Sequence, residues 1–95
     1  MIKEYSDYLD NERSIKTVVK TGIGAFNRTI ELIKVTEGYE PAGSAMRHTK
    51  AGYRVCTYDP FDNTRYSTQY KWFSEASERF YALTTPIKAI NTWCI

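Results

Sequence analysis

Alternating hydrophobic and polar positions between Gly52 and Leu83 form the clearest structural pattern in the chain. The runs Tyr53–Tyr58 and Thr64–Phe73 alternate in this way and are rich in aromatic and β-branched residues, which predicts two strands. Between them, the segment DPFDN favours a hairpin turn, because proline fixes one backbone angle while Asp and Asn bond nearby backbone. One face of the second strand carries the large rings and should lie on the core: Thr64, Tyr66, Thr68, Tyr70 and Trp72.

A helix is predicted to follow the second strand, beginning at Ser74. The Ser74 hydroxyl can accept from a free N–H group of the first turn, and Glu75 and Glu78 suit the positive end of a helix. The apolar residues Ala76, Phe80 and Leu83 recur at helical spacing. The sequence therefore predicts a strand–strand–helix unit, with the apolar side of the helix lying on the sheet.

The N-terminal half favours helices. Met1–Glu12 has the apolar spacing of a short amphipathic helix, and the apolar residues of Ser14–Val35 recur three or four positions apart. Ser14 could cap this second helix. Many β-branched residues oppose it, and the alternative is two strands with a turn near Thr21–Ala25 or at Phe26–Asn27.

Two glycines interrupt this segment, at Gly22 and Gly24. Each costs about 1 kcal/mol inside a helix, so a helix here is expected to bend. The pair lacks the third glycine and the Lys-Ser/Thr step of a phosphate-binding loop. We expect these small residues to let another element approach closely.

Two further segments complete the predicted fold. Thr36–Gly52 holds several glycines and a proline and is expected to be a loop or an irregular edge. Thr84–Pro86 marks a break, after which Ile87, Ile90, Trp93 and Cys94 form the apolar stripe of a short second helix. The predicted fold is α+β: a single small domain, residues 1–95, with a helical N-terminal half, a β-hairpin and C-terminal helices.

Composition limits the function. Thirteen basic against eleven acidic residues, a net charge of +2, oppose both a strongly electrostatic nucleic-acid binder and an acidic DNA mimic. Eight tyrosines exceed what one small core can hold, so some should lie at an interface. The absence of a leader and of a long apolar run predicts a soluble cytoplasmic protein without membrane contact.

Candidate chemistry is sparse. Cys56 and Cys94 could form a disulfide, but we expect two reduced thiols; a single histidine, His48, excludes a histidine-based metal centre. A Cys56–His48 nucleophile pair is improbable at a mid-strand cysteine. Asp59 and Asp62 could hold a weakly bound cation, but capping the turn explains them more simply. We therefore expect no enzyme activity, no cofactor and no metal.

The densest basic patch is the segment MRHTKAGYR, with Arg47, His48, Lys50 and Arg54 beside Tyr53. Basic residues next to an aromatic strand can contact phosphates and stack on bases. The same residues can equally be an ordinary solvated loop.

One local pattern, YRVCTYDPFDNTRYSTQYKWFSEASERF, resembles integrase arm-binding and related small sheet domains. The likeness lies in a strand that ends in an aromatic residue, an F-[ST] step and a Glu-Ala helix start, here Phe73 to Ala76. Such domains read DNA with the sheet. The resemblance implies this role for Arg54, Arg65, Gln69 and Lys71.

In general character the chain also resembles small phage-encoded anti-defence proteins, including anti-CRISPR proteins. That resemblance implies a non-catalytic inhibitor that occupies a surface on a larger, nucleic-acid-handling protein complex. The alternative is direct binding of DNA or RNA through the basic loop and the exposed sheet face. The predicted partner-binding residues for these hypotheses are Arg47, Lys50, Tyr53, Arg54, Tyr58, Arg65, Tyr66, Lys71 and Trp93.

Overall fold

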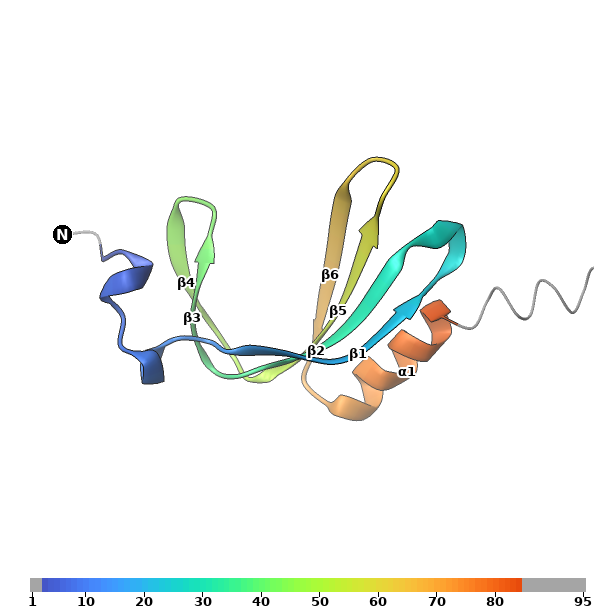
Figure 1. Cartoon of the computed structure of the whole chain (residues 1–95). Helices are drawn as coiled ribbons and strands as arrows, with labels where there is room; N and C mark the ends of the chain where they lie inside the picture. Colours follow the sequence, from blue (N-terminus) through green and yellow to red (C-terminus); the bar gives the residue numbers. More distant parts are fainter. Residues whose placement is uncertain (1–2, 85–95) are drawn as a thin grey trace, which may run out of the picture.

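The computed structural model describes residues 3–84, and about half of these residues form antiparallel strands (Figure 1). The main sheet has four strands in the order β1-β2-β5-β6, and a separate hairpin pairs β3 with β4. The bounds are β1 Lys16–Ile23, β2 Thr29–Val35, β3 Gly38–Ala42, β4 Ala45–Thr49, β5 Gly52–Asp59 and β6 Thr64–Tyr70. The α-helix α1 (Phe73–Thr84) lies along one face of the main sheet. The described residues also form three short 3-10 turns: η1 Tyr5–Asp7, η2 Asp10–Glu12 and η3 Ala25–Asn27.

The predicted strand–strand–helix unit is present as β5, β6 and α1. The two strands pair in register from Tyr53 opposite Tyr70 to Asp59 opposite Thr64. The second strand is shorter than predicted, because Phe73 begins the helix instead of ending the strand. Its ring stands edge-on to that of Tyr53, 5.3 Å away between centroids.

The core lies between α1 and the sheet. Its buried side chains are Ile30, Leu32, Val55, Ala76 and Phe80, with Tyr53, Tyr70 and Leu83 packed around them. Alternation puts Ile30 and Leu32 of β2 on the helix face, opposite the helical residues Ala76 and Phe80. The expected apolar face of the helix is therefore confirmed.

The two glycines of β1 and its following turn let the helix approach, as expected. A Cβ atom at Gly22 would lie 2.9 Å from the Thr84 methyl carbon, and one at Gly24 only 2.8 Å from the Leu83 carbonyl oxygen. Both positions face the C-terminal end of α1. Side chains there would push the helix away from the sheet.

The predicted helix over Ser14–Val35 is wrong, and the strand alternative holds. The segment forms β1 and β2, with the turn at Phe26–Asn27. Many β-branched residues suit a pleated strand, and a register shift between Val18 and Lys20 breaks the alternation that would have identified β1. Ser14 caps no helix; its hydroxyl instead donates to the carbonyl of Thr36 at 2.7 Å.

The predicted N-terminal helix is also wrong over the residues described. η1 and η2 are single turns, each closed by an acidic side chain that accepts from the backbone N–H group three residues earlier. Asp7 accepts from Glu4, and Glu12 accepts from Leu9, both at 3.0 Å. Such local bonds compete with a continuous helix.

The loop predicted over Thr36–Gly52 is a hairpin, which is a further correction. Pro41 lies within β3, where an edge strand tolerates the missing N–H group. Gly43 supplies the positive φ, 64°, of the tight turn into β4. The second helix predicted after Thr84–Pro86 falls outside the described residues. Over residues 3–84 the fold is thus mainly antiparallel sheet with one α-helix, and not a helical half followed by a hairpin.

Candidate functional site

Two predicted partner-binding arginines bind a carboxylate of the protein itself. Glu40 of β3 is almost fully buried, and its oxygens accept from Arg54 of β5 and from Arg47 of β4. Lys16 of β1 adds an ion pair at 2.8 Å, and Thr49 donates a hydroxyl at 2.6 Å. The cluster ties the hairpin to the main sheet, and its positive groups hold the pKa of Glu40 far below its usual range.

Arg54 has little capacity left for an external ligand. Its side chain is only 12% exposed, and its Nε atom donates to Gln69 at 2.9 Å. Gln69 in turn donates to the carbonyl of Lys50 at 2.8 Å. Two of the residues expected to read DNA, Arg54 and Gln69, are therefore bonded to each other across β5 and β6.

Three other predicted residues gather at the opposite end of the sheet. Arg65 lies over the ring of Tyr58, 5.4 Å from its centroid, and Tyr58 donates its hydroxyl to Asn63. Tyr66 follows on the helix-facing side of β6 and is 62% exposed. Arg65 forms no ion pair with any described residue, which leaves its guanidinium group available.

The remaining predicted residues are scattered. Tyr53 packs against the core and Phe73, so it serves folding. Lys71 lies over the ring of Trp72 just after β6, and Lys50 is exposed between β4 and β5. Trp93 falls outside the described residues.

The turn between β1 and β2 carries an exposed ring that was not among the predicted residues. Phe26 is 74% exposed, and its backbone has φ 57° and ψ 32°, in the left-handed region. Asn27 shares this conformation, with φ 60°, so the turn has the two positive φ angles of a type I′ hairpin. Asn and Gly are the usual residues at this position of the turn. A bulky side chain such as that of Phe26 strains the backbone there.

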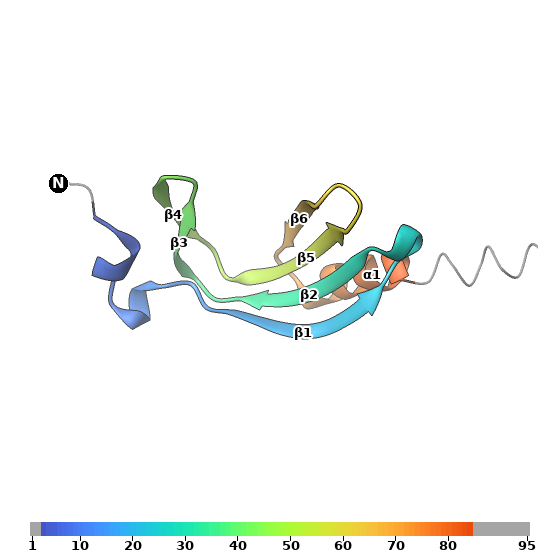
Figure 2. The same cartoon turned by 45° about the horizontal axis from the view of Figure 1, so that its top comes forward.

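A second ring projects from the turn between β5 and β6. Phe61 is 85% exposed, the most exposed of the large apolar side chains described. Because β1 and β5 run in the same direction, their following turns lie at the same end of the sheet (Figure 2). We call this end, with Phe26, Tyr58, Phe61 and Arg65, the tip surface.

One carboxylate connects the two turns. Asp59, which is 8% exposed, accepts from Arg28 Nε at 3.1 Å through one oxygen and from the Phe61 amide at 2.9 Å through the other. Arg28 directly follows the Phe26 turn, and it also lies 5.5 Å from the centroid of the Phe26 ring. The Arg28–Asp59 bond therefore ties together the two turns that carry these rings.

Sequence reasoning included Tyr58 and Arg65 but missed Phe26 and Phe61. Phe61 stood inside a recognised turn, where an apolar residue with no core to reach is a signal for exposure. The sequence pattern hides Phe26, because the apolar spacing of Ser14–Val35 predicts a helix. Only the strand alternative puts Phe26 on a turn.

Cys56 and Asp62, the other candidate residues for catalysis or cation binding, have environments that suit structural roles. Burial raises the pKa of the Cys56 thiol, which opposes a thiolate nucleophile at neutral pH. Asp62 accepts from the backbone and hydroxyl groups of Thr64, so turn capping explains it. Within residues 3–84, no group of three or more His, Cys, Asp or Glu side chains could hold a metal ion.

No helix in the described part of the chain is long and apolar enough to span a membrane. Comparisons of the chain with protein-family models, with curated proteins and with solved structures gave no match.

Proposed function

We propose that the protein is a non-catalytic binding module that docks on a larger protein through the tip surface and blocks or modulates that protein. The observation that carries the proposal is the pair of phenylalanine rings, 74% and 85% exposed, on adjacent turns. Large aromatic side chains that enter pockets on a partner supply most of the affinity of many interfaces. Phe26 and Phe61 would act as these anchors, with Tyr58 and Arg65 beside them.

Backbone strain supports a role for Phe26 beyond folding. A bulky residue in the left-handed region costs on the order of 1 kcal/mol, and its ring is 74% exposed, so it buries little surface in return. A turn selected for stability alone would carry Asn or Gly. Binding of a partner would explain why an exposed phenylalanine occupies this strained position.

Charge around Phe61 favours a protein partner with a basic rim. Phe61 stands between Asp59 and Asp62, and hydrogen bonds from Thr64 lower the pKa of Asp62 and keep it ionised. Because Asp59 is paired with Arg28, the negative charge beside the ring comes from Asp62, and it disfavours contact of the ring with anionic lipid or nucleic-acid phosphate. It suits an apolar pocket edged by Lys and Arg, as on proteins that bind nucleic acid in basic grooves.

The alternative, direct nucleic-acid binding through the basic loop and the exposed sheet face, has weaker support. Arg47 and Arg54 pair with Glu40, and Gln69 pairs with Arg54. Most of the donors of Arg54 and Gln69 are therefore committed within the fold, whereas Arg47 keeps one terminal nitrogen and is 62% exposed. Of the sheet-face cations expected to contact DNA, Arg65 and Lys71 form no ion pair with residues 3–84, and Lys71 lies over the ring of Trp72.

Site-specific photocrosslinking tests the proposal. Benzoylphenylalanine replaces Phe61 in one version and Glu37, an exposed residue at the other end of β2, in a matched control. Both proteins are irradiated in nuclease-treated lysate of the source organism. We expect one discrete protein adduct from position 61 and none from position 37. Equal adducts from both positions, or adducts that disappear with nuclease, would overturn docking through the tip surface.

A further inference from the structure

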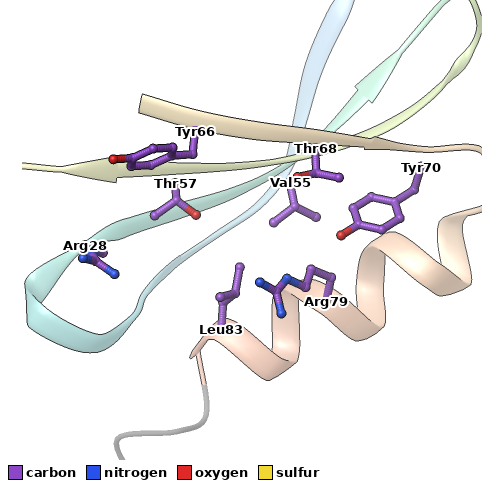
Figure 3. Close-up of a pocket in the computed structure, with 8 residues that line it drawn as sticks. All are labelled: Arg28, Val55, Thr57, Tyr66, Thr68, Tyr70, Arg79 and Leu83. Carbon is purple, nitrogen blue, oxygen red and sulfur yellow. The ribbon is translucent and has the colours of Figure 1, made fainter. Parts of the chain in front are cut away.

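A pocket of about 220 Å³ lies between β6 and the C-terminal half of α1, on the helix-facing side of the sheet (Figure 3). Its floor is apolar, formed by Val55 and Leu83, and hydroxyl side chains and two arginines surround it. The pocket exists because α1 packs chiefly over β2 and β5 and leaves part of β6 uncovered. Arg28 also supports the tip surface through Asp59 and Tyr70 also packs against the core, but these roles do not account for Arg79 or for the hydroxyl groups of Thr57, Tyr66 and Thr68 in the lining.

Two guanidinium groups face this pocket from different elements. Arg28 lies in the turn just before β2 and Arg79 in α1, and in Figure 3 their charged ends point toward the space between them. Asp59 engages only the Nε atom of Arg28, so the two terminal nitrogens keep their donor capacity. Asp59 also fixes the direction of that side chain.

Arg79 has no partner within the described part of the chain. Glu75 stands one helical turn earlier, the usual spacing for an ion pair, yet the two side chains form none. Four lining hydroxyl groups likewise make no hydrogen bond to residues 3–84; they belong to Thr57, Tyr66, Thr68 and Tyr70. The pocket thus concentrates positive charge and unused donors.

We infer that this pocket binds an oxyanion of the phosphate class. Two arginines offer forked donors that match the oxygens of a phosphate group, and hydroxyl groups complete its hydrogen bonding. A volume of about 220 Å³ lies below the roughly 300–1,000 Å³ of pockets that enclose drug-sized ligands. The pocket therefore takes the phosphate group itself, free or carried on a nucleotide or a single strand whose remainder stays outside.

The exposed ring of Tyr66 at the rim suits a ligand that continues beyond the phosphate. A nucleobase attached to the bound group could stack on this ring, which is 62% exposed. The pocket shares Arg28 with the support of the tip surface, but Arg79 and Thr68 lie outside that surface, so a change at Arg79 tests the inference separately from the docking proposal.

Titration followed by amide NMR shifts tests the inference, with inorganic phosphate, a nucleoside monophosphate and a short single-stranded oligonucleotide as separate probes at constant ionic strength. We expect saturable shifts at Thr57, Thr68 and Arg79 for each probe and none with chloride. Arg79→Gln should weaken phosphate binding about tenfold, the loss expected for one charge-assisted contact. Lys34→Gln, which removes an exposed cation of β2 outside the pocket, should leave binding unchanged.

The three probes distinguish the sources of the anion. Equal affinities would identify an isolated phosphate site, whereas tighter binding of the oligonucleotide through the same residues would identify a nucleic-acid strand. Shifts that rise linearly without saturation, or that Arg79→Gln leaves intact, would overturn the inference. Because Arg79 is exposed and unpaired within the described residues, its substitution should leave the fold intact, which the unperturbed spectrum of the variant will show.

Discussion

Arg28 donates from Nε to the Oδ2 atom of Asp59 at 3.1 Å and so joins the two turns that carry the exposed rings. The second oxygen of Asp59 caps the amide of Phe61 at 2.9 Å. One nearly buried carboxylate therefore fixes the geometry of the tip surface before any partner arrives. Such preorganisation lowers the entropy lost on binding.

Removal of this carboxylate should loosen both turns while the core stays folded. Asp59→Ala loses a charged pair and a turn cap, and we expect the free energy of unfolding to fall by about 1–3 kcal/mol. Amide hydrogen exchange should accelerate at residues 25–28 and 60–63 and stay unchanged in α1. Uniform acceleration throughout the sheet and helix would contradict this local role.

Glu40 should stabilise the fold far more than an exposed carboxylate of the same hairpin region. Glu40→Gln leaves Arg54, 12% exposed, without its counterion, and breaking a buried pair costs about 3–5 kcal/mol. Urea unfolding followed by circular dichroism measures the loss. The matched variant Glu37→Gln, at a carboxylate 67% exposed, should change stability by less than about 0.5 kcal/mol. Similar losses in the two variants would refute the assignment.

The same carboxylate predicts a dependence of stability on pH. Hydrogen bonds from Arg54, then from Lys16, Thr49 and Arg47, hold the pKa of Glu40 well below its ordinary value of 4.5, against the opposing effect of burial. A lowered native pKa gives stability that is complete above the unfolded value and is lost as the pH falls below it. The stability gap between the wild type and Glu40→Gln should be constant above about pH 5 and shrink below about pH 4.5. A gap that widens on acidification would contradict the account.

Gly22 and Gly24 both lie close to α1, so the cost of adding a side chain can be compared between the two positions. Gly24→Ala sets a Cβ atom 2.8 Å from the Leu83 carbonyl oxygen, a backbone atom that cannot move alone. Its destabilisation should reach about 1–3 kcal/mol. At Gly22 the nearest atom is the Thr84 methyl carbon at 2.9 Å, which can rotate away, so Gly22→Ala should cost less. Thermal unfolding of the two variants checks this order.

Local signals predicted the second half of the fold and failed in the first half. From Tyr53 to Leu83, strand alternation, turn residues and helical spacing agree, and the hairpin and the helix are present. The second strand ends at Tyr70, however, and the helix begins one residue earlier than predicted, at Phe73. In β1, the register shift at Val18–Lys20 removes the alternation, and every residue but Gly22 is exposed because the strand lies at a sheet edge. The remaining signal, apolar residues of Ser14–Val35 that recur three or four positions apart, is typical of a helix and led to the wrong prediction.

Local sequence patterns predict only part of the candidate site, because the rest depends on contacts between distant parts of the chain. Tyr58 and Arg65 were placed because their strands were recognised. Arg47 and Arg54 were expected to be free cations, since nothing local reveals that Glu40, seven and fourteen residues away, is buried between them. The Arg28–Asp59 bond spans 31 residues and likewise depends on the tertiary fold.

Phe26 should contribute nothing to stability. Phe26→Asn installs a residue that tolerates the left-handed backbone, so the free energy of unfolding should stay the same or rise by up to about 1 kcal/mol. Chemical denaturation of the variant gives this value directly. A loss above about 1 kcal/mol would show that the ring supports the fold and would remove the argument for recognition.

The most direct test of docking through the tip surface is the affinity of the crosslinked partner for Phe26→Asn/Phe61→Ser, measured by calorimetry without nucleic acid. Two lost anchors of about 2 kcal/mol each predict at least a hundredfold weaker binding by a protein that remains folded. The control Leu9→Ser/Trp72→Ser removes two exposed apolar side chains away from the tip surface and should bind like the wild type. Wild-type affinity in the phenylalanine variant, or equal losses in both double variants, would contradict the proposal.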